Sequence, residues 1–252
     1  MLKKGIAEMS HLDVDRFAKI SRFYRLDPRV KLICTIALVV VLAFITDLLP
    51  LLLMAAFVLG LVLSSRVPIK HMARNFAFAL MFIAFASAVM LLTSGWMAAL
   101  TIFIRISTSV LALLLLVSTT PFFRLMRGFQ ALRMPQVLTG LIMFTYRFIF
   151  ILLEEMERMR MARMARGFSG GTSILDRTAF KTLSATIGMV FVRANLRATN
   201  IYDALLSRGY TGEIRTMGQL EVRGIDGAFA AAFVIMMMFT IVLQVGVVHW
   251  TL

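Results

Sequence analysis

The chain has 252 residues, of which 60% are hydrophobic, and its mean hydropathy is +0.87. A soluble domain is only about 45–50% apolar and could not bury this much apolar surface. Disorder is excluded as well, because disordered chains are poor in hydrophobic residues. The sequence therefore predicts an integral membrane protein, and its single cysteine, Cys34, excludes a disulfide scaffold and a cysteine metal cluster.

The net charge of +14 is unevenly distributed along the chain. Charged residues are concentrated in residues 1–31 and 121–226, and they are absent from residues 227–252. A basic chain can bind nucleic acid, but most of these arginines interrupt or follow apolar segments. Their placement favours a charged cytoplasmic face and contact with proteins over a nucleic-acid partner.

Five apolar segments approach the roughly 20 residues that a membrane-spanning helix needs. They are residues 30–46, 48–64, 76–93, 97–119 and 228–250. Residues 137–153 are also apolar, but a crossing there would place the arginines of residues 158–166 outside, against the positive-inside rule. We therefore expect 137–153 to be the apolar half of a long helix that packs on protein from the cytoplasmic side.

The charges of the loops predict the orientation of these spans. The N-terminal stretch and residues 66–74 are basic and are expected in the cytoplasm, whereas the loops at Asp47 and at 93–96 lack basic residues and are expected outside. The N-terminus is then cytoplasmic and the C-terminus external. Asp27-Pro28 predicts a helix start, with Asp as N-cap, and residues 12–24 are expected on the membrane surface.

The predicted fold is thus all-α, with five transmembrane helices and a cytoplasmic domain of one short and two long helices. The domain helices are expected at residues 122–132, 136–166 and 174–208. The whole chain divides into an amphipathic N-terminal segment (1–29), four spans (30–119), the cytoplasmic domain (120–226) and a last span (227–252).

The two long helices end in the same pattern of small residue, Arg, Gly and aromatic residue. One end reads Ala165-Arg166-Gly167-Phe168 and the other Ser207-Arg208-Gly209-Tyr210. Ordinary C-capping explains either end alone, since Gly adopts the left-handed conformation and Arg suits the helix dipole. Two matching ends in one chain also predict two equivalent docking elements, each of which would bind one of two equivalent sites on a dimeric partner.

The first long helix carries a dense run of charged residues and methionines. The run comprises Glu154, Glu155 and Glu157, then Arg158, Arg160 and Arg163, with Met156, Met159, Met161 and Met164 between them. Glu154 and Arg158 have the spacing of an i,i+4 ion pair. A solvated helix would explain the charges, whereas the methionines favour a surface that repacks against a partner. For the second interpretation, the candidate contact residues are Glu154, Glu155, Met156, Met159 and Arg163.

Other kinds of chemistry find little support in the sequence. There is no G-x-x-x-x-G-K-[ST] loop, so we expect no ATP binding by this chain, and the Gly-rich residues 167–173 lack the lysine of a phosphate loop. His11, His71 and His249 are far apart and predict no metal site. Arg105 lies inside a predicted span, where it either extends toward the interface or pairs with Asp47.

On these residues the chain resembles the transmembrane coupling subunit of energy-coupling factor (ECF) transporters, of the CbiQ type found in cobalt and nickel uptake systems. Three kinds of motif carry the resemblance, which covers nearly the whole chain. They are Leu26-Asp27-Pro28-Arg29-Val30-Lys31-Leu32, then Tyr146-Arg147-Phe148 followed by Glu154-Glu155-Met156-Glu157-Arg158, and the two Arg-Gly helix ends. The second Arg-Gly end departs from the family pattern only in opening with Ser207 in place of Ala.

The resemblance implies a subunit in a bacterial cytoplasmic membrane that joins a membrane-embedded substrate-binding component to two cytoplasmic ATPases. Ala165, Arg166 and Gly167, and likewise Ser207, Arg208 and Gly209, would dock on the two ATPases. The long helices would relay movement driven by ATP, with ATP and Mg bound by the ATPases and no cofactor in this chain. Cobalt or nickel is the expected cargo, and the alternative within the family is the same subunit of a vitamin transporter. Outside the family, the alternative functions are a membrane enzyme acting on a phosphorylated substrate and a passive scaffold or channel.

Overall fold

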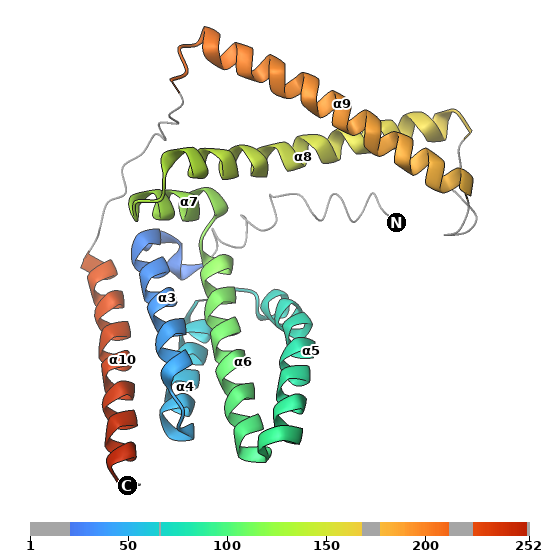
Figure 1. The fold of residues 1–252 in the computed structure, drawn as a ribbon. Helices are drawn as coiled ribbons and strands as arrows, with labels where there is room; N and C mark the ends of the chain where they lie inside the picture. Colours follow the sequence, from blue (N-terminus) through green and yellow to red (C-terminus); the bar gives the residue numbers. More distant parts are fainter. Residues whose placement is uncertain (1–20, 66, 168–176, 212–223, 251–252) are drawn as a thin grey trace. The chain divides into compact units, whose positions relative to one another are not determined.

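The computed structural model describes residues 21–65, 67–167, 177–211 and 224–250, and all regular secondary structure in these ranges is helical (Figure 1). The elements in chain order are η1 (Arg22–Arg25), α3 (Pro28–Phe44), α4 (Leu48–Ser64), α5 (Ile69–Ser94), α6 (Trp96–Thr119), α7 (Phe122–Ala131), α8 (Gln136–Ala165), α9 (Arg177–Ser207) and α10 (Gly224–Trp250). The prediction of an all-helical chain is confirmed for these residues.

The chain forms two compact units, each described here by itself. The first, which we call the bundle, consists of Met1–Arg133 and Met217–Leu252 and contains α3 to α7 and α10. The second, the helix pair, is Met134–Thr216 and contains α8 and α9. The chain therefore leaves the bundle once, after α7, and returns to it once, before α10.

Within the described ranges, four helices are long and apolar enough to cross a membrane. They are Met72–Ser94, Trp96–Thr119, Gln136–Ala165 and Gly224–Gln244. Two of the predicted spans instead form helices of 17 residues, α3 and α4, and the ambiguous residues 137–153 belong to the 30-residue α8. α5 begins at Ile69, before its apolar part, because helix formation does not stop where hydropathy falls.

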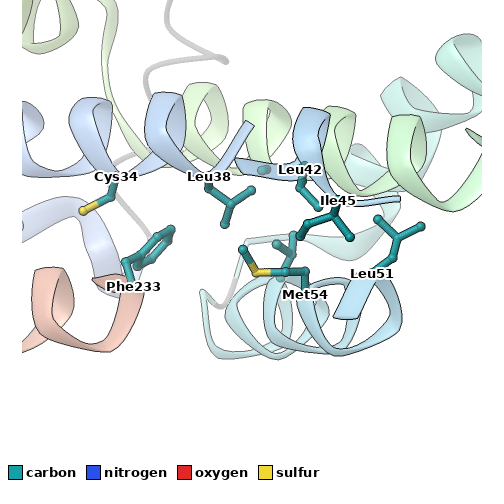
Figure 2. Packing of buried hydrophobic residues seen from close by; sticks show 9 residues of the cluster. Cys34, Leu38, Leu42, Ile45, Leu51, Met54 and Phe233 are labelled. Carbon is teal, nitrogen blue, oxygen red and sulfur yellow. The ribbon is translucent and has the colours of Figure 1, made fainter. Parts of the chain in front are cut away.

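The core of the bundle lies where α3, α4 and α10 meet (Figure 2). Leu38 and Leu42 of α3 and Leu51 and Met54 of α4 are at most 1% exposed. Phe233 of α10 completes this cluster, and its ring stands edge-on to Phe57 at 5.2 Å between centroids. An aromatic pair in this arrangement adds to the packing between α4 and α10.

The start of α3 confirms the prediction made from Asp27-Pro28. Asp27 is the N-cap, its carboxylate accepts a hydrogen bond from the Arg29 amide at 2.9 Å, and Pro28 occupies the first turn. Of the segment expected on the membrane surface, residues 12–20 lie outside the described residues. Phe23 is half-buried, and its ring lies 5.7 Å from that of Phe229 in α10.

For Arg105 the sequence left open an extension toward the interface or a pairing with Asp47, and the structure gives it a third partner at the end of α3. The half-buried Arg105 guanidinium, from α6, donates to the main-chain carbonyl of Ile45, the C-cap residue of α3. The last carbonyls of a helix lack partners within the helix and carry partial negative charge, so they attract a cation. Arg105 therefore caps the C-terminal end of α3.

The turn between α3 and α4 is also tied to α10. The Gln244 side chain of α10 donates to the Thr46 hydroxyl at 2.6 Å and accepts from the Asp47 amide at 3.3 Å. These bonds join residues almost 200 positions apart in the sequence. They fix the register of α10 against α3 at this end of the bundle.

Candidate functional site

The C-terminal end of α8 forms a tight cap on its last turn. Ala165 is the last helical residue and Arg166 is the C-cap, with its amide donating to the Arg163 carbonyl at 3.1 Å. The Gly167 amide donates to the Met164 carbonyl at 3.1 Å, and Gly167 has φ of +81°. This left-handed conformation costs glycine little, because it has no Cβ. Phe168, the aromatic residue of the motif, lies outside the described residues.

The end of α9 repeats this local conformation. Ser207 is its last residue, and the Arg208 amide donates to the Leu205 carbonyl at 3.1 Å. The Gly209 amide donates to the Leu206 carbonyl at 2.9 Å, and Gly209 has φ of +76°. The two Arg-Gly ends thus share both their sequence and their backbone geometry, and the C-capping prediction is confirmed at each.

Both ends present their motif residues to the surroundings. Ala165, Arg166, Gly167, Ser207, Arg208 and Gly209 are all exposed. With the other described residues, neither Arg166 nor Arg208 forms a side-chain hydrogen bond or an ion pair. A guanidinium held on a rigid helix end with its donors available can bind a carboxylate or a main-chain carbonyl of a partner in two-pronged fashion.

The charged run of α8 is largely paired within the helix. Arg158 lies 3.7 Å from Glu154, as the i,i+4 spacing predicted. Arg160 holds Glu157 with two hydrogen bonds of 2.6 and 2.8 Å, and this bonding raises the pKa of the Arg160 guanidinium above its usual value. These pairs stiffen the helix.

Three of the candidate contact residues lie on the same helix with different exposures. Met156 is exposed, whereas Met159 and Arg163 are half-buried. The Arg163 Nε donates to the Met159 carbonyl at 3.3 Å, so its side chain folds back on its own helix. Of these three, Met156 is the residue most open to contact with a partner.

Glu155 has a different environment from the other candidate residues, because it lies between the two helices. It is 8% exposed and hydrogen-bonds Arg193 of α9, with Arg197 a further 3.8 Å contact. Figure 1 shows the two helices crossing. Reasoning from the sequence missed Arg193 and Arg197, although two arginines four residues apart beside an apolar run were a visible signal.

A groove of about 620 Å³ opens beside this crossing. Its charged and polar lining consists of Glu155 and Arg158 from α8 and Arg193, Arg197 and Asn200 from α9. Three arginines and one glutamate line the groove, and Arg158 also pairs with Glu154, so the lining has a modest excess of positive charge.

We expect the Glu155 contact to hold the crossing of α8 and α9. Glu155→Gln should weaken it by only about 1 kcal/mol, because the two arginines are half exposed and screened by solvent. Glu155→Lys should separate the helices, since it sets three cations against one another. Spin labels at Met161 and Tyr202, in a Cys34→Ala background, would report this as a broadened distance distribution. The exchange of charges in Glu155→Arg with Arg193→Glu should restore a narrow one; a narrow distribution in Glu155→Lys would show that the contact is dispensable.

No group of three or more His, Cys, Asp or Glu side chains that could hold a metal ion occurs among the residues that the structure describes.

The family model described as "Cobalt transport protein", CbiQ, matches residues 21–220. This match covers most of the chain, both Arg-Gly ends and the Asp27-Pro28 motif. The chain belongs to the CbiQ family. It is accordingly a multi-pass membrane protein of a transporter family. The resemblance to this family that was drawn from the sequence motifs is confirmed.

Similar proteins agree with this assignment. An uncharacterized protein of Methanocaldococcus jannaschii is 29% identical over 84% of this chain and 86% of its own length. The cobalt transport protein CbiQ of Rhodobacter capsulatus is 30% identical over 62% of this chain and 66% of its own length. The energy-coupling factor transporter transmembrane protein EcfT of Bacillus selenitireducens is 29% identical over 75% and 80%. The CbiQ family member described here is thus similar to transmembrane components of ECF transporters.

Proposed function

We propose that this protein is the energy-coupling transmembrane subunit of an ECF importer for cobalt. It relays ATP hydrolysis by two cytoplasmic ATPases to a membrane-embedded substrate-binding component. The observation that carries the proposal is the pair of exposed Arg-Gly ends with the same backbone geometry. The family description and the relatives named EcfT support the transporter class.

In this proposal each Arg-Gly end docks on one ATPase. Arg166 and Arg208 supply the charged anchors, and the flanking Ala165, Ser207 and glycines allow close approach of the partner because they are small. Two equivalent ends match the two copies of one ATPase, as closed symmetry requires. ATP and its Mg²⁺ are bound by those partners, and this chain acts as a coupling component and not as an enzyme.

The crossing of α8 and α9 supports a relay between the two ends. Glu155 joins α8 to Arg193 and Arg197, so a displacement of one helix end is carried through the crossing to the other helix. The exposed side of α8, with Glu154 and Met156, is then available to the substrate-binding component. Methionine suits such a surface because its flexible side chain adapts to a moving partner.

We further propose five spans, with the N-terminus in the cytoplasm and the C-terminus outside. The spans are α3, α4, α5, α6 and α10, and α7, α8 and α9 form the cytoplasmic coupling domain within residues 120–226. α8 is apolar enough to cross, but a crossing would carry its arginines from Arg158 to Arg166 to the external side. The bilayer in question is a cytoplasmic membrane, and residues 1–29 lie on its inner side.

A binding experiment with the purified partners tests this function. The chain, in lipid nanodiscs, is expected to capture two copies of the ATPase, and the complete transporter in vesicles should accumulate cobalt only when ATP is supplied on the ATPase side. Native mass spectrometry measures the stoichiometry and radioactive cobalt the uptake, with nickel as competitor. Capture of one ATPase, or uptake without ATP, would contradict the proposal.

A further inference from the structure

The two helices at which the chain leaves and re-enters the bundle are bonded to one short segment of the bundle. The chain leaves the bundle through α7 and returns through α10. Both of these helices are bonded to residues 24–31, which we call the anchor segment. It contains most of the Leu26-Asp27-Pro28-Arg29-Val30-Lys31-Leu32 motif, to which the proposed function assigns no role.

α10, where the chain re-enters the bundle, is attached to the anchor segment through Asp226 in its first turn. Asp226 is 1% exposed, and its Oδ1 accepts a hydrogen bond from the Asp27 amide at 2.7 Å. Asp27 is 2% exposed and caps α3. A carboxylate accepting a main-chain hydrogen bond in a buried place forms one of the stronger hydrogen bonds in proteins. The first turn of α10 is therefore held firmly to the first turn of α3.

α7, after which the chain leaves the bundle, is attached to the anchor segment through Arg124 in its first turn. Its guanidinium donates to the main-chain carbonyls of Tyr24 and Leu26 and lies over the Tyr24 ring, 4.9 Å from its centroid. One turn later Gly128 lies on Pro28, where an added Cβ would sit 3.5 Å from Pro28 atoms. Arg124 and Gly128 together seat α7 on the anchor segment.

The junction between α6 and α7 is bonded to the same segment by Lys31. The Lys31 ammonium, in a side chain 4% exposed, donates to the Thr119 carbonyl at 3.3 Å and to the Thr120 hydroxyl at 3.4 Å. It therefore caps α6 at the point where the chain turns into α7. Asp27 and Lys31 of this end of α3 are thus bonded to α10 and to the junction of α6 and α7, and Arg124 binds the residues just before it.

We propose that the anchor segment is the part of the bundle on which the helix pair acts, with Asp226 and Arg124 as its positioning residues. The inference rests on the proposed function. The helix pair is joined to the bundle by two covalent connections, one after α7 and one before α10, and both of these helices are bonded to the start of α3. A displacement that the chain transmits to either helix therefore reaches the start of α3. α7 and α10 consequently move α3 together. If either helix were released from the anchor segment, that helix would bend when the helix pair moved, and the displacement would not reach α3.

The first test measures hydrogen exchange of the chain alone in nanodiscs. Asp226→Ala removes the acceptor and should speed exchange at the Asp27 amide by about tenfold or more, the effect of losing a hydrogen bond to a charged group. Asp226→Asn keeps an acceptor oxygen and should stay near wild type. The matched control is Gln244→Ala, at the other end of α10, which should loosen residues 45–47 and leave the anchor segment unchanged. Wild-type exchange at Asp27 in Asp226→Ala would overturn the inference.

The second test uses the complete transporter with its ATPases and substrate-binding component. Asp226→Ala should still capture the ATPases and hydrolyse ATP, but lose uptake, while Asp226→Asn and Gln244→Ala should retain uptake. Arg124→Gln, which releases the other connection, should uncouple in the same way and decides the matter if Asp226→Ala does not fold. Wild-type uptake per ATP hydrolysed in whichever variant folds would overturn the inference. An absence of ATP-dependent uptake in the wild-type transporter would instead contradict the proposed function, and the exchange measurement would still decide whether residues 24–31 form an anchor.

Discussion

The double variant Arg166→Glu with Arg208→Glu is expected to lose ATPase capture completely and to abolish ATP-dependent uptake, while it still inserts into the membrane. If each Arg-Gly end docks on an ATPase, its guanidinium is a central anchor of the interface. Truncation of such an anchor weakens the binding free energy by about 2 kcal/mol or more. Glutamate is worse than alanine, because it places the opposite charge in a site built for a cation. Each single variant should keep one ATPase-binding end.

The competing explanation predicts a much smaller effect. If the arginines only suit the dipoles of α8 and α9, replacing either one costs at most about 1 kcal/mol of helix stability, and binding is unchanged. A pull-down against the ATPase pair measures capture, and circular dichroism measures helix content. Arg177→Glu, at the exposed first residue of α9, is the matched control for a reversed charge on the same helix. Wild-type capture by the double variant would reduce both motifs to helix caps.

Leu42→Ala is expected to destabilise the bundle by about 2 kcal/mol, the low end of the range for leucine truncations in protein cores. Leu42 is fully buried in the cluster of α3, α4 and α10. Lipid is as apolar as leucine, so the transfer part of the usual cost is reduced in a membrane protein, while the cost of the cavity is retained. Unfolding of the detergent-solubilised protein by dodecyl sulfate, followed by circular dichroism, measures the shift.

The matched control for this prediction is Leu63→Ala in the neighbouring helix. Leu63 is 70% exposed, so its truncation leaves no cavity and should leave the midpoint of unfolding nearly unchanged. Equal effects of the two substitutions would mean that the packing of α3 against α4 does not hold the bundle together.

Much of this protein followed from its sequence, because the physics concerned was local. Composition alone indicated a membrane protein, and hydropathy located most of the helices. Asp27-Pro28 began α3 as its capping chemistry predicted, and Gly167 and Gly209 ended α8 and α9. The Glu154–Arg158 pair followed from helical spacing. The caps and the ion pair depend on residues at most a few positions apart, and composition and hydropathy depend on no pairing at all, so no knowledge of the fold was needed.

The buried side of the apolar helices was decided only by the tertiary structure. In α3, Leu38 and Leu42 are buried, whereas Ile36 and Val40 are exposed. All four are apolar, since a helix surrounded by lipid needs no polar face, and the periodicity that marks the core side of a soluble helix is absent. Packing against α4 and α10 makes the distinction.

The partners of the charged residues were likewise decided by the tertiary structure. Arg105 caps α3 at Ile45 and does not pair with Asp47, Glu155 binds Arg193, and Asp226 binds the amide of Asp27. These partners are separated by 60, 38 and 199 positions. A buried charge must be satisfied by whatever group the packing brings to it, and the sequence shows the charge but not the neighbour that folding supplies.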